Sequence, residues 1–242
     1  VTLKAIGNIG RVESVAEKLV RCFEKADNQL EIRLAAVQAL RRMPCGSAQM
    51  QSLKSLFETQ DLNVELRLVA FMGAMQCPTK ELISDVLQTL QVEPTNQVTN
   101  FAWSYLKAKK GSSDPCQSDL NTLLRHTRLG TKYNRDFRQF SRFFEFGNFN
   151  ARRNYGGHAE AGWIFSPESY IPKQGFMNLT LHLFRTNFNL LEVGGRTEGL
   201  DHLINKFYGP DGYFTNPESY LMKETRKPHS NRRIQTFEDF YR

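Results

Sequence analysis

The sequence lacks the short motifs that mark common classes of enzyme. It contains no G-x-S-x-G nucleophile elbow, no H-E-x-x-H, no P-loop and no G-x-G-x-x-G fingerprint. Its five histidines, His126, His158, His182, His202 and His229, fall on different predicted elements, and none has a carboxylate or cysteine at metal-ligand spacing. We therefore expect no catalytic residue, no metal ligand and no enzymatic activity.

Long apolar runs are also missing. No run approaches the ~20 residues that a membrane-spanning helix requires, so we expect no transmembrane segment. The chain begins VTLKAIGNIG without Met or a signal peptide and ends TFEDFYR without a terminator, which favours a piece of a larger protein. Leu3 and Ile6 are typical of the last turn of a helix that Gly7 and Gly10 would close.

The charge balance is basic but mild. The 32 Lys and Arg residues exceed the 25 Asp and Glu residues, giving a net charge of +7. Such a balance suits an anionic partner, whether nucleic acid, phospholipid headgroups or heparin-like sugars, without choosing among them. The basic residues near the C-terminal end are Lys223, Arg226, Lys227, Arg232 and Arg233. Although Tyr220 and Phe237 stand near them, no strand platform interleaves aromatic and basic positions, so we expect no nucleic-acid partner.

The first half of the chain contains a repeated segment. The copies are EIRLAAVQALRRM at 31–43, ELRLVAFMGAMQC at 65–77 and a fainter QVTNFAWSYLKAK at 97–109. A repeat of 32 to 34 residues is typical of a helical solenoid. The matching apolar positions are Ile32, Ala35, Ala36, Ala39, Leu40 and Met43 in the first copy and Leu66, Val69, Ala70, Gly73, Ala74 and Cys77 in the second.

Each repeat predicts a pair of helices. The first helices of the pairs are expected near 13–25, 48–59 and 79–90, and the second near 30–43, 63–76 and 96–109. Asp27, Asp61 and Thr95 are the candidate N-caps of the second helices. After the polar linker 111–116, a short amphipathic helix is expected to stop at Gly130.

The composition and the period change in the second half. Fourteen of the 18 Phe residues follow residue 116, and apolar residues alternate with polar ones at 177–183, a period of two that indicates strands. Strands are expected near 136–146, 157–165, 176–185 and 187–198, followed by a short helix at 200–207 and a polar loop from 215. We therefore predict an α+β fold, a helical solenoid of antiparallel pairs followed by an antiparallel sheet with one apolar face.

Several single residues carry structural hypotheses. Cys45 and Cys77 each follow the second helix of a repeat, so they share an edge of the solenoid, and a disulfide between them is reasonable. Two unpaired thiols in a cytosolic repeat remain the alternative, and the pairing of Cys22 and Cys116 stays undetermined. The Asn178-Leu-Thr triplet is an N-glycosylation pattern, with an ordinary strand Asn as its alternative.

Two strand carboxylates, Glu160 and Glu192, stand alone in the sequence. They are expected to be lateral salt-bridge partners instead of an acid/base pair.

Four segments, in their order along the chain, resemble a known family. They are LEIRLAAVQALRRM (30–43), DFRQFSR (136–142), IFSPESYIPK (164–173) and LLEVGGRTEGL (190–200). Together they closely resemble the large lipid transfer proteins: insect apolipophorins, apolipoprotein B, vitellogenins and microsomal triglyceride transfer protein. RRMPC with QCP one repeat later is most like an arthropod apolipophorin, with vitellogenin as the alternative, although no phosphoserine tract is present.

This resemblance implies a division of labour along the chain. Residues 1–130 would be the C-terminal part of the family's α-helical superhelical domain, and 131–242 the start of the β-sheet that lines its lipid cavity. The lipid-facing candidates are Phe137, Phe140, Trp163, Phe165, Leu179, Leu181, Leu183, Phe188, Leu190 and Val193. Composition alone would favour missing protein over this face, whereas the resemblance favours lipid, held by burial of apolar area with broad selectivity.

The function that the resemblance implies is lipid transport by an extracellular lipoprotein scaffold in haemolymph or plasma. The expected cargo is phospholipid, diacylglycerol or triacylglycerol, and sterol, and the expected partners are a lipoprotein receptor or other parts of the same polypeptide. Yolk lipid storage is the alternative within the family. An intracellular HEAT-like interaction scaffold is the alternative of another class, but it leaves the Phe-rich strands unexplained.

Overall fold

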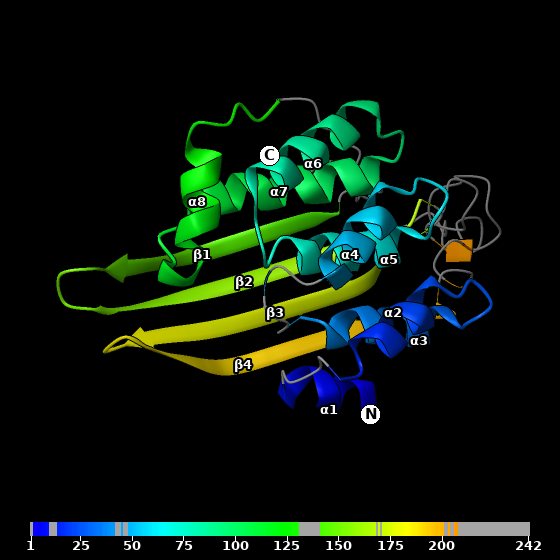
Figure 1. Ribbon diagram of the computed structural model, residues 1–242, viewed down its shortest axis with the longest axis horizontal. Helices are drawn as coiled ribbons and strands as arrows, with labels where there is room; N and C mark the ends of the chain where they lie inside the picture. The colour runs from blue at the N-terminus through cyan, green and yellow to red at the C-terminus, as the bar shows by residue number, and fades with distance from the viewer. Residues whose placement is uncertain are drawn as a thin grey trace, which may run out of the picture. The chain divides into compact units, whose positions relative to one another are not determined.

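The computed structural model describes residues 2–9, 14–41, 45, 48–130, 141–167, 169, 171–200, 203, 206 and 207. The chain divides into two compact units, Val1–Glu198 and Gly199–Arg242. The labelled helices and strands of Figure 1 all belong to the first unit.

Helices fill the first half of the chain. They are α1 (Thr2–Ile9), α2 (Ala16–Glu24), α3 (Leu30–Ala39), α4 (Ala48–Glu58), α5 (Val64–Ala74), α6 (Lys80–Val92), α7 (Asn96–Gly111), the 3₁₀ turn η1 (Pro115–Gln117) and α8 (Ser118–Arg125). Along the inner layer, α1 contacts α3, α3 contacts α5 and α5 contacts α7, while α2, α4 and α6 form the outer layer. The stacked helix pairs confirm the predicted solenoid.

The inner helices are buried on more than one side. In α5 every residue from Val64 to Phe71 is buried, including Glu65 and Arg67. An amphipathic surface helix would bury a single stripe, so this pattern shows a helix enclosed between two layers. Its partners are α4 on one side and β2 on the other.

Some details of the predicted helices are wrong. Ala36 and Leu40 are buried as expected, but Ile32 is 41% exposed, because it lies in the first turn of α3, before the packed part begins at Leu34. The helices α3 and α5 each begin three residues after the Asp that was expected to cap them, whereas α7 begins directly after Thr95, as expected. Gln29 therefore precedes α3, and Asn63 caps α5 by accepting a hydrogen bond from the Glu65 amide.

Gly7 does not end a helix as expected, since α1 continues to Ile9. A Cβ at Gly7 would lie 3.1 Å from the Cα of Ala39. The missing side chain therefore allows α1 to approach α3 closely.

An arginine recurs at the same place in two repeats and joins the helices of each pair. Arg33 Nε donates to the carbonyl of Phe23 over 2.7 Å, and Arg67 Nε donates to the carbonyl of Phe57 over 2.9 Å. The buried Arg67 also pairs with Glu93 after α6, with Nη1 3.0 Å from Oε1. These bonds satisfy carbonyls at the C-terminal ends of α2 and α4, which the helices themselves leave without a donor.

A disulfide joins two adjacent repeats. The Sγ atoms of Cys45, after α3, and Cys77, after α5, are 2.12 Å apart, and the two Cα atoms are 5.3 Å apart. This is the pairing that the sequence predicts. Cys22, half-buried against the helical core, and the exposed Cys116 are free thiols.

The strands form one antiparallel meander. They are β1 (Arg142–Asn150), β2 (Tyr155–Phe165), β3 (Pro172–Leu183) and β4 (Thr186–Arg196), in the spatial order β1-β2-β3-β4. The predicted topology is confirmed, but β1 begins at Arg142, and residues 136–140 of the expected first strand lie outside the described part. Of the helix expected at 200–207, four residues are described: Leu203, Lys206 and Phe207 are helical and Leu200 is not, and the loop from 215 lies outside the described part.

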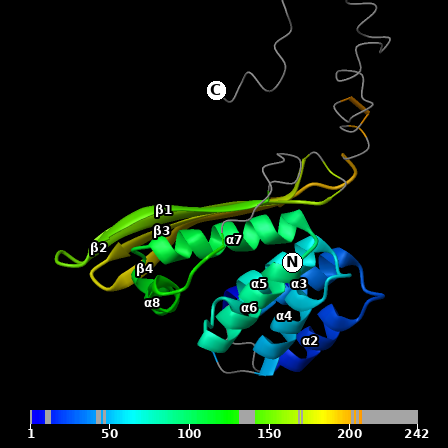
Figure 2. The same cartoon turned by 90° about the horizontal axis from the view of Figure 1, so that it is seen from above.

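The helices cover one side of the sheet. Figure 2 shows the sheet nearly edge-on, with the labelled helices on a single side. The contacts run from α7 to β1 and β2 and from α5 to β2. Among the described residues no helix has the length and hydropathy to cross a membrane.

Candidate functional site

The side of the sheet that points away from the helices is apolar along all four strands. Side chains alternate between the two sides of a strand, so the pairing register assigns each residue to a side. This surface, called the outer face below, consists of Phe144, Phe146, Trp163, Met177, Leu179, Leu181, Leu183, Phe188, Leu191 and Val193. None of the described helices or strands lies on it (Figure 2).

The outer face is exposed in the described part of the chain. Phe146 is 67% exposed, Val193 51% and Met177 45%. Three of its four aromatic residues gather on the β1 side, where the Phe144 ring lies 4.8 Å from that of Trp163 and 6.2 Å from that of Phe146. This is an unusually large continuous apolar surface for a water-facing sheet, and it indicates a binding surface.

Six of the ten residues expected on an apolar face lie on the outer face: Trp163, Leu179, Leu181, Leu183, Phe188 and Val193. Phe165 is half-buried beside a register irregularity at the end of β2. Leu190 is the extra residue of a bulge in β4, so the alternation does not place it. Phe137 and Phe140 lie outside the described residues.

Four residues of the outer face were missed from the sequence: Phe144, Phe146, Met177 and Leu191. The sequence could have placed the first three on this face, because each stands two residues from another residue of the outer face in its strand. Leu191 needed the bulge to be recognised.

The opposite side of the sheet meets the helices through polar and charged groups. Its apolar part is a small patch at one end, where Phe143, Ile164 and Phe176 pack against the core around α7. The Tyr105 ring lies 4.7 Å from the Phe143 ring and 5.2 Å from the Phe71 ring of α5. Away from this patch, ion pairs and hydrogen bonds make the contact.

Lys109 of α7 is the centre of a buried charge cluster. Its Nζ lies 2.8 Å from Glu145 Oε2 of β1 and also pairs with Glu160 of β2. Burial opposes the charge, but Tyr105, Glu160 and Glu145 outweigh it and raise the pKa of Lys109 above its usual range. Glu160 is thus a salt-bridge partner, though between helix and sheet instead of across strands.

Arg196 makes a second link at the far end of β4. Its Nε lies 2.7 Å from Oε2 of the buried Glu65 in α5, and its Nη1 lies 2.8 Å from Oε1 of Glu31 in α3. The hydrogen bond to Glu65 is the main cause that raises the pKa of Arg196 above its usual range. Glu192 precedes Arg196 by four residues in β4 and lies 3.6 Å from Arg41, which follows α3. This ion pair also joins the sheet to the helices.

Two histidines that are far apart in the sequence are neighbours on this helix-facing side. His158 of β2 and His182 of β3 have ring centroids 5.1 Å apart, beside Asp114 from the turn before η1. The spacing along the sequence, which places no carboxylate at ligand distance from a histidine, therefore does not reveal this spatial group. The antiparallel pairing of β2 and β3 joins them.

Asn178 also points to the helix-facing side. It is half-buried on the inner strand β3, and its Oδ1 accepts a hydrogen bond from Asn189 Nδ2 over 2.9 Å. Glycosylation of Asn178 stays a prediction.

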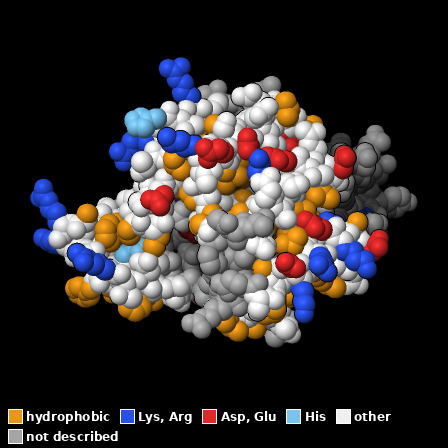
Figure 3. All heavy atoms as spheres, in the orientation of Figure 1, with side chains coloured by type: hydrophobic (Ala, Val, Ile, Leu, Met, Phe, Trp, Pro, Cys, Tyr) orange, Lys and Arg blue, Asp and Glu red, His pale blue; other side chains and the backbone are white. Residues whose placement is uncertain are grey.

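The two sides of the molecule therefore differ in kind. Figure 3 shows the helix-bearing side, where acidic and basic side chains are interspersed over the surface, as is typical of a solvated layer. The outer face on the other side of the sheet carries almost no charge. Such a surface binds apolar molecules through the apolar area that it removes from water. It offers few hydrogen-bonding or charged groups that would recognise one molecule by its orientation.

Comparison with known families divides the chain between its helices and its sheet. Residues 1–107 match the family model described as Vitellogenin TPR domain, and residues 139–240 match the one described as Vitellinogen, open beta-sheet. The chain belongs to the family of large lipid transfer proteins. The sequence resemblance is confirmed.

Curated relatives align over most of this chain but only over a small part of their own length. The apolipophorins of Locusta migratoria are 29% identical over 99% of this chain and 7% of their own length. Apolipoprotein B-100 of Rattus norvegicus is 28% identical over 88% of the chain and 5% of its length, and vitellogenin of Penaeus merguiensis is 26% identical over 87% and 8%.

A solved structure shares the fold. A structure described as showing lipid–protein interactions in lipovitellin matches with a TM-score of 0.73 at 26% identity, covering 85% of this chain and 22% of the lipovitellin chain. The α+β fold of solenoid and antiparallel sheet is thus that of the family.

Proposed function

We propose that this chain is part of a lipid-transport protein and that the outer face lines the space in which the lipid is held. The observation that carries the proposal is the inverted sheet: the polar side is packed on the helices, and the apolar side is left without a described covering element. The family membership and the likeness to lipovitellin support it.

The energetics favour an apolar occupant. Burying a large apolar side chain stabilises by roughly 2 kcal/mol, so ten partly exposed side chains on one surface leave a large free energy to be gained. Lipid chains gain this energy without specific polar partners. The cargo is accordingly broad in class: phospholipid, diacylglycerol or triacylglycerol, and sterol.

The two domains have different roles in this proposal. Residues 1–130 form the end of the helical solenoid, which supports the sheet from behind, and residues 131–242 begin the domain whose strands face the lipid. The Cys45–Cys77 disulfide supports a secreted protein acting in haemolymph or plasma, since disulfides persist in oxidising compartments. A lipoprotein receptor and other parts of the same polypeptide are the proposed partners.

Lipid extraction from the intact protein tests this function. The double variant Leu181→Asp and Leu183→Asp places two charges on the outer face and is expected to lower the lipid recovered per protein, measured by organic extraction and mass spectrometry. A milder pair, Leu179→Thr and Leu181→Thr, keeps strand-forming residues at the same surface and should lower lipid content less.

A matched control places the same charges on the helices. Ile32→Asp and Val92→Asp alter exposed apolar residues of α3 and α6, on the other side of the molecule, and should leave lipid content unchanged. Equal lipid content in the Asp pair at Leu181 and Leu183, with the sheet still formed, would refute the lipid-lining role and leave an ordinary protein interface.

A further inference from the structure

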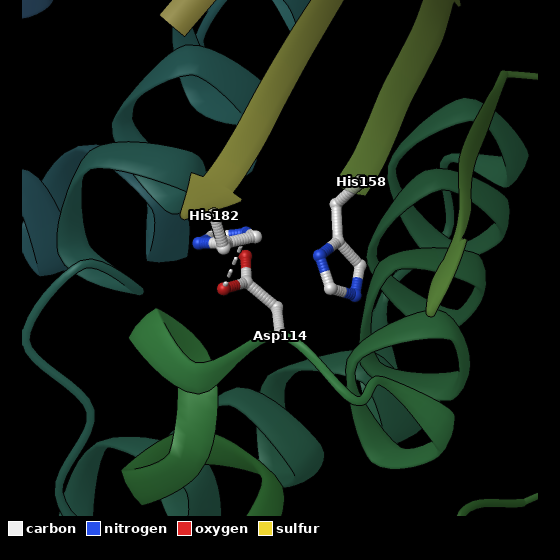
Figure 4. Close-up of side chains that lie close together, drawn as sticks. All are labelled: Asp114, His158 and His182. Carbon is white, nitrogen blue, oxygen red and sulfur yellow. Dashed lines mark ion pairs between the residues drawn. The ribbon is translucent and has the colours of Figure 1, made fainter. Parts of the chain in front are cut away.

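Three ligand-type side chains from distant parts of the chain meet behind the sheet. Asp114 caps η1, His158 belongs to β2 and His182 to β3, and Figure 4 shows the three converging from three different elements. One nitrogen or oxygen of each lies within 4.8 Å of the others. His158 is 3% exposed and His182 2%, so the group sits inside the protein, between the sheet and the helical layer.

The hydrogen bonds of His182 leave one nitrogen lone pair facing the carboxylate. Its Nδ1 is 2.7 Å from Asn187 Oδ1, while Asn187 Nδ2 donates to the thiol of Cys116 over 2.8 Å. Since the amide oxygen only accepts, the proton of the neutral ring is on Nδ1. Nε2 is then an acceptor 3.5 Å from Asp114 Oδ1, with no hydrogen bond among the described residues. Two acceptors that face each other call for a positive charge between them.

His158 has the same arrangement with the nitrogens exchanged. Its Nε2 lies 3.2 Å from the hydroxyl of Ser113, and its buried Nδ1 has no hydrogen-bond partner in the described part of the chain. His158 therefore has one ring nitrogen in contact with a protein group and the other left open to a ligand. Buried polar atoms without partners are rare, and two in one cluster need a cause.

A single proton does not satisfy the whole cluster. A proton on Nε2 of His182 would pair that ring with Asp114, but Nδ1 of His158 would still lack a partner. One cation placed among the three groups satisfies both nitrogens and the carboxylate together.

We propose that Asp114, His158 and His182 bind a zinc ion that fastens the turn after α7 to strands β2 and β3. Two neutral imidazoles and one carboxylate are a ligand set that zinc takes up, at about 2.0 to 2.2 Å per bond. A tetrahedral ion holds its ligands about 3.3 Å apart, so the cluster contracts on binding. The second nitrogens of both rings are already held by Asn187 and Ser113, as in metal sites whose outer partners fix the ring.

Water takes the fourth position in this arrangement. Cys116 lies next to the cluster, but its thiol already accepts a hydrogen bond from Asn187 Nδ2.

Zinc titration of the intact protein tests the site. The purified protein is stripped with a chelator and titrated with Zn²⁺ against a chromophoric competitor. Asp114→Asn keeps the size and the cap of η1 but removes the charge, and should weaken one equivalent of binding at least tenfold. His158→Gln should act in the same way, and Zn²⁺ should raise the thermal midpoint of the unchanged protein but not of Asp114→Asn.

The exposed His126 at the end of α8 provides the matched control, and His126→Gln should bind zinc as the unchanged protein does. If His158→Gln fails to fold, Asp114→Asn alone decides. Equal zinc stoichiometry and affinity in Asp114→Asn and the unchanged protein, or no zinc binding by either, overturns the proposal and leaves a proton or a water molecule in the cluster.

Discussion

The two sides of the sheet are built in opposite ways. The helix-facing side places charged and polar groups against the solenoid, with Lys109 and Arg196 at the centres of two ion-pair clusters. The outer face is apolar and carries no described element. In most two-layer folds the apolar side of the sheet meets the helices. We infer from the reversal that the sheet binds something beyond the solenoid, and that charged contacts join the two layers together with the small apolar patch around Phe143.

The largest expected effect comes from breaking the charge cluster on the helix-facing side. Lys109→Met keeps the volume but leaves Glu145, a buried carboxylate, without its cation. We expect a loss of about 3 to 5 kcal/mol in the free energy of unfolding, measured in urea. Lys107→Met, in the same helix but exposed, should change it by less than about 0.5 kcal/mol.

A triple variant sharpens this result. Adding Glu145→Gln and Glu160→Gln to Lys109→Met removes the unpaired charges and should recover much of the lost stability. If the triple variant is as unstable as the single one, packing and not charge holds the layers together.

The second largest effect concerns the solenoid alone. Cys45→Ala with Cys77→Ala opens a loop of sequence separation 32, which in the chain-entropy model costs about 3 to 4 kcal/mol. The measurement is thermal or urea unfolding of the lipid-free protein, with Cys116→Ala as the control for a free thiol. Because the bond lies away from the sheet, lipid content should not change, and a large loss of lipid would contradict the separate roles of the two layers.

The third effect is a pH dependence from the helix-facing side, measured with zinc chelated. Burial lowers the pKa of His158 in the folded protein, where Asp114, Glu145, His182 and Lys109 act on it. The unfolded chain therefore takes up a proton below the ordinary histidine pKa of about 6.5 while folded His158 does not. The free energy of unfolding should fall as the pH falls from 7 to 5. His158→Gln should show a smaller fall over the same interval, and an equal slope in both proteins would contradict the burial effect.

The helices could be predicted because their signal is local. A period of 3.6 with small residues at mid-face suffices to find a packed helix, and the recurring sequence fixes how the pairs stack. The exact starts were missed, as with Asn63 in place of Asp61, because a cap depends on where the turn ends. The close approach at Gly7 depends on α3 and cannot be seen in α1 alone.

The sheet was predicted in outline but not in its faces. In β4 the step from Phe188 to Leu190 is two positions, but the step from Leu190 to Val193 is three. A regular strand therefore cannot place all three side chains on one side of the sheet. The bulge at Leu190 resolves this, and Leu191 joins Val193 on the outer face. Nothing local to β4 shows where the bulge lies.

The histidine cluster was beyond sequence reasoning for a similar reason. Asp114, His158 and His182 are 44 and 24 residues apart along the chain. They meet because β2 and β3 pair with His158 opposite Thr180, which places His182 diagonally beside it. A shift of one residue in that register would move His182 to the outer face.

The smallest effect is expected on the outer face, and it separates a lipid surface from a hidden protein core. Met177 and Val193 are directly paired across β3 and β4, and both are about half exposed. Met177→Thr with Val193→Thr keeps good strand formers, so the free energy of unfolding of the lipid-free protein should change by less than about 0.5 kcal/mol. Phe143→Ala, on the helix-facing side, should by contrast cost about 3 to 5 kcal/mol. The same Thr pair should lower lipid content in the loaded protein, because it removes apolar area only where lipid would be in contact. A cost near 2 kcal/mol for the Thr pair without lipid would mean that another part of the protein covers this surface, and the outer face would then be a core like any other.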